Sequence, residues 1–177
     1  MDNLETNVIN EATYNAFWSK MQQFKFDIVY YCVHFNACIN INRKIKFFVV
    51  FTTAIFTGIW MTWHTLSRIN TVCGVAIIAL QALSAISELF PYEKRKNELR
   101  ELIAELEPLY LEMENDWRRI NSCEVDDEYA RVALDKYAKK QIEIKNHFFK
   151  DDTLPEKEKY RTKADNLTEE YFKNNYR

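Results

Sequence analysis

The sequence predicts an all-α membrane protein with three parts. These are an N-terminal amphipathic helix, a two-helix transmembrane hairpin and a C-terminal cytosolic helical part. Two long apolar stretches follow one another between residues 47 and 90. Only two glycines and three prolines occur in 177 residues, which disfavours a fold rich in turns and strands. Outside the hairpin, apolar residues recur at spacings of three and four, which is the helical period.

The central hairpin comprises two stretches, 47–67 and 69–90, of which the first reads FFVVFTTAIFTGIWMTW at its core. About 20 helical residues cross a hydrocarbon core of about 30 Å, and both stretches reach that length. Both are apolar around most of their circumference, whereas a core helix of a globular protein normally keeps a polar stripe. The alternative is a hairpin buried in a globular helical core. The remaining chain is too polar to surround both arms, so we expect transmembrane helices.

The distribution of cations predicts the orientation of this hairpin. Residues 40–46 carry three cations and residues 91–96 carry three, whereas the turn between the arms carries only Arg68. Cytoplasmic loops of membrane proteins are enriched in Lys and Arg close to the membrane. We therefore expect a multi-pass protein with both termini cytoplasmic.

Residues 1–46 are predicted to form cytosolic or interfacial helices. Apolar residues recur at helical spacing from Glu11 to Gln23, which predicts a helix there. The next segment, Phe24 to Cys38, mixes aromatic and polar residues. It fits an amphipathic helix on the membrane surface and equally a helix packed on the C-terminal part.

Residues 91–177 are predicted to form the cytosolic helical region. Its first helix runs from Glu93 to Ile120, and Pro108 should kink or divide it. One face of this helix is apolar and should pack on other helices or between subunits. We expect this packing face to consist of Leu102, Leu106, Tyr110, Met113 and Trp117.

Two further helices are predicted after the polar break at 121–127. Asp126 or Asp127 can cap the first of them, which should end near Phe149. Thr153 and Glu156 have the spacing of a capping box, with Pro155 near the start of the last helix.

A stripe of small and polar residues on the second arm is the candidate functional feature. Gly74, Gln81, Ser84 and Glu88 recur at helical spacing on one face. Lipid cannot satisfy polar groups, so they face a water-filled path or another helix. The stripe could therefore line a pore in an oligomer or form a packing seam, and a two-helix protein needs such seams in any case.

Nothing in the sequence indicates enzymatic chemistry. The three histidines lie far apart and lack a carboxylate partner at helical spacing. The four cysteines do not have the spacing of a metal site, and no glycine-rich phosphate loop occurs. The net charge of −2 gives no reason to expect direct binding of nucleic acid. We expect a protein that is not an enzyme and has no cofactor or metal.

The layout and the segment LQALSAISELFPYEKRKNELRELIAELEPLYLEMENDW, residues 80–117, resemble the SLATT family. SLATT proteins are two-transmembrane effector domains of bacterial nucleotide-signalling and antiphage conflict systems. The resemblance covers roughly residues 12–120 and rests on layout, because no catalytic motif is shared.

The resemblance implies a pore-forming effector in the bacterial inner membrane. Such a protein would oligomerise and perturb or permeabilise the bilayer when infection is sensed. Residues 121–177 are too few for a typical nucleotide-sensing domain, so the trigger would be a sensor protein or a nucleotide-type ligand. The alternative function is a membrane-anchored helical adaptor or scaffold without pore activity. A phage-type holin fits less well, because holins usually lack so long a cytosolic extension.

Overall fold

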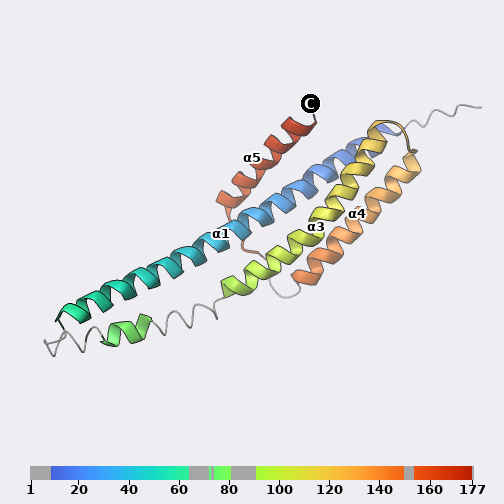
Figure 1. Ribbon diagram of the computed structural model, residues 1–177. Coiled ribbons are helices and arrows are strands. Elements are labelled where there is room, and N and C mark those ends of the chain that lie inside the picture. The colour runs from blue at the N-terminus through green and yellow to red at the C-terminus, as the bar shows by residue number, and fades with distance from the viewer. Residues whose placement is uncertain (1–8, 64–71, 73, 81–90, 150–153, 177) are drawn as a thin grey trace, which may run out of the picture. The chain divides into compact units, whose positions relative to one another are not determined.

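The computed structural model describes residues 9–63, 72, 74–80, 91–149 and 154–176. Within these residues the chain is all-helical and contains no strand, so the predicted fold class, all-α, is confirmed. Residues 72 and 74–80 are helical as well. Figure 1 shows the four long helices, which are α1 (Glu11–Trp63), α3 (Pro91–Asn121), α4 (Asp127–Phe148) and α5 (Glu158–Asn175).

The chain divides into two compact units. Unit 1 combines Met1–His34 with Glu98–Arg177, and unit 2 is Phe35–Asn97. Unit 1 thus contains the first part of α1, most of α3, and all of α4 and α5.

Helix α1 is one continuous element of 53 residues. The sequence predicted a separate helix up to Gln23 and a distinct segment from Phe24 to Cys38. No proline occurs in α1 and Gly58 is its one glycine, so no residue before the last turns interrupts the backbone hydrogen bonds. The alternation of aromatic and polar residues between Phe24 and Cys38 therefore does not end the helix.

The core of unit 1 contains one apolar stripe from each of its helices. On α1 the stripe follows spacings of four and three, as in helices that pack along their length. It continues through Ile28 and Tyr31, so residues 24–34 pack within unit 1. The buried apolar residues of α1 are Phe17, Met21, Phe24, Ile28, Tyr31 and Val33.

Helix α3 supplies the most buried face of this core. All five residues of the predicted packing face are at most 4% exposed, and Leu102, Leu106 and Met113 are fully buried. Pro108 lies inside α3, and the helix continues through it without a break.

The turn between α3 and α4 caps the C-terminal end of α3 and the N-terminal end of α4. Glu124 N–H donates to Arg119 O at 3.0 Å and Cys123 N–H donates to Ile120 O at 3.1 Å, which is the Schellman pattern. Cys123 takes the left-handed position of that motif, with φ of 58°. Asp126 then caps α4 by accepting a hydrogen bond from Tyr129 N–H at 2.8 Å, as predicted.

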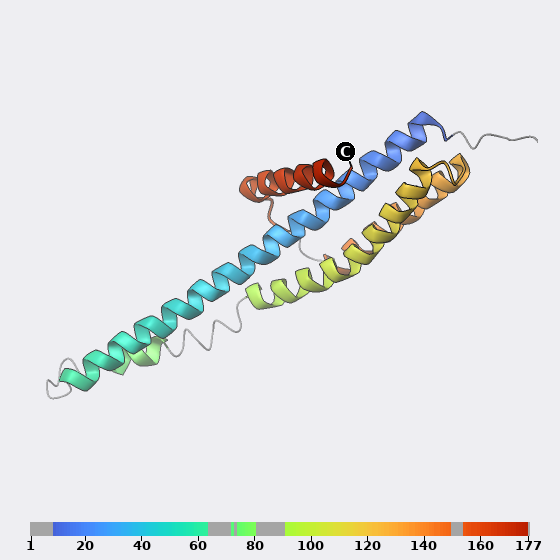
Figure 2. The same ribbon diagram turned by 45° about the horizontal axis from the view of Figure 1, so that its top comes forward.

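Helix α5 starts later than the capping-box spacing indicated. Its N-cap is Lys157, which makes no side-chain capping bond, and Thr153 lies outside the described residues. Glu156 instead pairs with Arg161 at 2.7 Å. The helix lies against the first part of α1, as Figures 1 and 2 both show, with the rings of Trp18 and Phe172 5.2 Å apart.

The predicted multi-pass localisation in the inner membrane, with both termini cytoplasmic, is overturned. In the part of the chain that the structure describes, no helix combines the length and the apolarity that a membrane crossing needs. The apolar run at the end of α1, residues 47–63, spans about 25 Å and follows directly on Lys46. A hydrocarbon core is about 30 Å thick.

Candidate functional site: an apolar surface and an aromatic pocket

Unit 2 exposes a large apolar surface. On α1 the side chains of Phe47, Phe48, Val50 and Phe51 are between 56% and 69% exposed. The rings of Phe47 and Phe51 stack with centroids 6.0 Å apart. In the second helical stretch the exposed residues recur at every third position, so they share one side of the helix. The unit 2 apolar surface comprises Phe47, Phe48, Val50, Phe51, Ile55, Ile59, Val72, Val75 and Ile78.

The threonines interspersed in this surface do not make it polar. Thr52 Oγ1 donates to Phe48 O at 2.7 Å, and Thr53 Oγ1 donates to Val49 O at 2.8 Å. Thr57 Oγ1 donates to Thr53 O in the same way, at 2.8 Å. Because each hydroxyl donates to the backbone one turn earlier, its donor is satisfied inside the helix.

Most of the predicted polar stripe falls outside the described residues. Gln81, Ser84 and Glu88 lie there, so the stripe stays a prediction. Gly74 is helical and half-buried. A Cβ added at Gly74 or Gly58 would meet no heavy atom within 4 Å. Neither glycine therefore marks a close approach of two helices in the described structure, as a small-residue seam requires.

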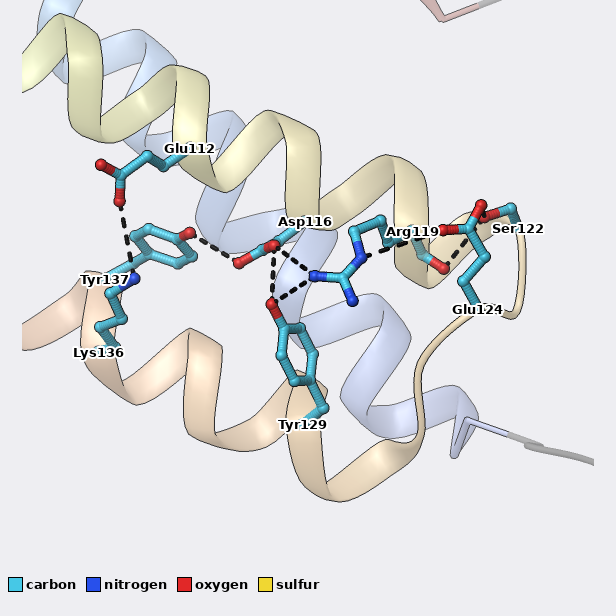
Figure 3. Close-up of polar contacts among 8 residues, drawn as sticks. All are labelled: Glu112, Asp116, Arg119, Ser122, Glu124, Tyr129, Lys136 and Tyr137. Atoms are coloured by element: carbon cyan, nitrogen blue, oxygen red, sulfur yellow. Dashed lines mark hydrogen bonds and ion pairs between the residues drawn. The ribbon is translucent and has the colours of Figure 1, made fainter.

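In unit 1, Asp116 is the centre of a polar cluster that links α3 to α4. Figure 3 shows its carboxylate between two tyrosines. Tyr137 Oη donates to Oδ2 at 2.7 Å and Tyr129 Oη donates to Oδ1 at 2.9 Å. Arg119 pairs with Asp116 at 3.5 Å and also donates to Tyr129 Oη. Burial, and then the bond to Asp116, raise the pKa of Tyr137.

The buried carboxylate of Glu114 ties α5 to α3. Tyr171 Oη donates to Glu114 Oε1 at 2.8 Å, and Tyr176 Oη donates to the same oxygen. Lys25 of α1 lies 3.9 Å from the centre of the Tyr171 ring, a cation–π distance. Burial lowers the pKa of Lys25, and the carboxylates of Glu114 and Glu107 oppose that change.

A third carboxylate, Asp27, ties α1 to α4. Lys145 Nζ and Gln141 Nε2 both donate to Asp27 Oδ2, at 2.5 and 2.9 Å. Asp27 also lines an open pocket of about 430 Å³ beside aromatic side chains. Because Lys145 and Gln141 already occupy one oxygen, this carboxylate mainly holds two helices together.

The most distinctive cavity of unit 1 lies where three helices come together. It is an open pocket of about 550 Å³ and receives residues from the start of α1, the end of α3 and the end of α5. Four of its side chains are aromatic, three are amides, and none is charged. This aromatic pocket is lined by Tyr14, Asn15, Trp18, Trp117, Asn121, Asn175 and Tyr176.

The aromatic side chains of this pocket contact one another at an angle. The ring of Trp117 lies 4.6 Å from that of Tyr14, with planes 47° apart, and 4.9 Å from that of Trp18, with planes 38° apart. Trp18 and Tyr176 meet almost edge-on at 5.3 Å. Trp117 is 4% exposed and belongs to the core, whereas the other three rings are half-buried.

Sequence reasoning missed this pocket. Of its lining it singled out only Trp117, as part of the packing face of α3. The aromatic content of 15% was the available signal, and it does not indicate which aromatic residues come together. Residues as distant as Tyr14 and Tyr176 line one cavity only through the packing of α5 on α1, which no local pattern reveals.

The chain was compared with protein-family models, curated proteins and solved structures, and none of them matches it.

Proposed function

We propose that the protein is a self-assembling effector of a bacterial antiphage defence system that perturbs membranes. The observation that carries this proposal is the exposed unit 2 apolar surface. The SLATT resemblance supplies the biological setting.

Exposure of the unit 2 apolar surface to water is unfavourable in free energy. Each Å² of apolar surface removed from water contributes about 25 cal/mol, so covering several aromatic and aliphatic side chains contributes many kcal/mol. Exposed apolar side chains that gather in this way mark sites of contact with proteins or lipid. The working state is the one in which other copies of the chain and the acyl region of a bilayer cover this surface. The proposal requires contact with lipid, and it does not require a helix that crosses the bilayer.

Unit 1 is the part that would receive the trigger. Its helices are tied together by the three carboxylates Asp27, Glu114 and Asp116, so a partner or ligand that contacts any of the helices acts on the whole unit. A sensor protein or a nucleotide-type ligand remains the proposed class of trigger.

The test uses vesicles loaded with a self-quenching dye and the purified full-length chain. In the first variant, F47E/F51E, two charges replace two rings of the unit 2 apolar surface. The matched control, L111E/V132E, adds the same charges at apolar positions of unit 1 that are equally exposed. We expect the wild type and the control to release dye and to form assemblies in light scattering. The first variant should do neither.

Equal dye release by both variants would show that this surface has no part in the activity.

A helical adaptor or scaffold without pore activity is the second candidate. It is favoured by the further exposed apolar side chains Leu111, Val132 and Ile142 on unit 1, which a partner could contact. Assembly of the wild type without dye release would identify that function instead.

A further inference from the structure

We propose that the aromatic pocket of unit 1 binds a small organic cation of the quaternary-ammonium class. This inference concerns unit 1 alone and does not depend on what the unit 2 apolar surface does.

The first support is the composition of the pocket. Aromatic faces carry negative electrostatic potential and attract ammonium groups, and several rings around one cavity are the usual way proteins bind quaternary ammonium. Here Tyr14, Trp18, Trp117 and Tyr176 line one cavity, and their planes are tilted relative to one another. Because these rings contact one another, they form a continuous wall of the cavity, and an ammonium group would lie against this wall and not between the rings.

The second support is the electrostatics of the helix ends. Asn121 is the last residue of α3 and Asn175 is the last residue of α5, and both line the pocket. The C-terminal end of a helix carries a partial negative charge, which favours cations. The helix that begins here, α1, has Glu11 in its first turn, and Asp127 Oδ1 accepts a hydrogen bond from Asn10 N–H. Its positive end is therefore already compensated.

The third support is the state of the polar groups. Tyr176 donates its phenol proton to the buried carboxylate of Glu114, which makes its ring more electron-rich. Asn175 donates through Nδ2 to Tyr171 O, so the partial negative charge of its amide oxygen remains available to a cation. The two basic residues in the last turn of α3 have acidic partners, because Arg118 pairs with Glu114 at 3.7 Å and Arg119 with Asp116. Lys173 is the basic residue in the last turn of α5, and it does not line the cavity. No cation lines the cavity within the described part of the chain.

The pocket volume also fits such a ligand. About 550 Å³ lies in the range of small-molecule sites and leaves ample room for a quaternary ammonium group, and the cavity is open to solvent. A phosphate-bearing ligand is disfavoured, since no described side chain of the lining can neutralise its charge.

The experiment uses the full-length chain carrying W60F and W63F, so that Trp18 and Trp117 are its only tryptophans. Choline is the probe, and 3,3-dimethylbutanol is its uncharged isostere. Saturable quenching of tryptophan fluorescence by choline, with little effect of the isostere, is expected. Equal binding of the two, or no saturable change with choline, overturns the proposal. Tighter binding of adenosine than of choline overturns it as well.

Charge changes at the exposed pocket residue Asn15 give a test of sign. N15D should strengthen choline binding about fivefold and N15K should weaken it about fivefold, the effect of one unit charge acting across a few ångströms of water. The matched control is Q23K, which puts the same charge on an exposed site of α1 outside the pocket and should leave choline binding unchanged. If N15D and N15K shift the affinity in the same direction, the site does not recognise charge and the proposal fails.

Discussion

Cys123 shows how a single residue can be suboptimal without harm to the fold. It occupies the left-handed position of the turn after α3, where φ is 58°. Glycine adopts this conformation freely, whereas for a residue with a Cβ it costs about 1 kcal/mol or more of folding free energy. The hydrogen bonds on either side, from Cys123 and Glu124 to the last turn of α3, fix the backbone in place regardless.

We therefore expect C123G to raise the free energy of unfolding by about 0.5–1 kcal/mol, since the relief of strain exceeds the extra chain entropy of glycine. Urea denaturation followed by circular dichroism measures this. C123A is the control, because it removes the thiol and keeps the Cβ, and it should leave stability nearly unchanged. If C123A stabilises as much as C123G, the thiol and not the backbone conformation is responsible.

Among the elements, α3 was the most predictable and α1 the least. The spacing of Leu102, Leu106 and Met113 is a local property of the sequence, and it identified a face that is buried in unit 1. The continuity of α1 was missed because polarity was given more weight than the absence of helix-breaking residues. The start of α5 was misplaced because a capping box needs only two residues at the right spacing, a pattern that also arises by chance.

The packing face of α3 allows a matched comparison along one helix. Leu106 is 0% exposed and Leu111 is 57% exposed. L106D buries a charge without a partner, which costs several kcal/mol, and it should unfold unit 1. L111D leaves its charge in water and should keep the helicity of the wild type. Circular dichroism and the apparent mass in light scattering separate the two outcomes, and wild-type helicity in L106D would mean that this face is not part of a core.

At the scale of the whole molecule, tyrosine burial predicts sensitivity to alkaline pH. Burial is the largest cause that raises the pKa of Tyr31, Tyr110, Tyr137 and Tyr176 above the usual value of about 10. Above that pH the unfolded chain loses phenol protons that the folded chain keeps, so the free energy of unfolding falls as pH rises. Lys20 and Lys25 act in the opposite sense, because burial lowers the pKa of each. The more numerous tyrosines should dominate.

Urea unfolding between about pH 9 and pH 12 measures this loss, and each buried tyrosine contributes a slope of up to about 1.4 kcal/mol per pH unit. Y137F should reduce the slope, although it also lowers stability at neutral pH by removing a bond to Asp116. A stability that stays constant across this range would show that the tyrosines ionise inside the folded protein.

The arrangement of the helices in the whole molecule could not be predicted from the sequence. Glu114 and Tyr171 lie 57 positions apart, and Asp27 and Lys145 lie 118 apart. Each pair is formed by helix packing that depends on the complete set of contacts. The apolar character of residues 47–59 is a local property and was visible in the sequence. That these residues end a long helix with a polar first part was not visible there.

The contact between Trp18 and Trp117 has an optical consequence. Two indoles 4.9 Å apart with planes 38° apart couple their electronic transitions, and such a pair gives a split circular dichroism band that isolated indoles lack. One ring belongs to α1 and the other to α3, so the contribution of this pair to the band exists only while these helices touch. The protein thus carries an intrinsic exciton probe of its own helix packing, which can be followed in dilute buffer, in vesicle suspensions or inside an assembly without any added label.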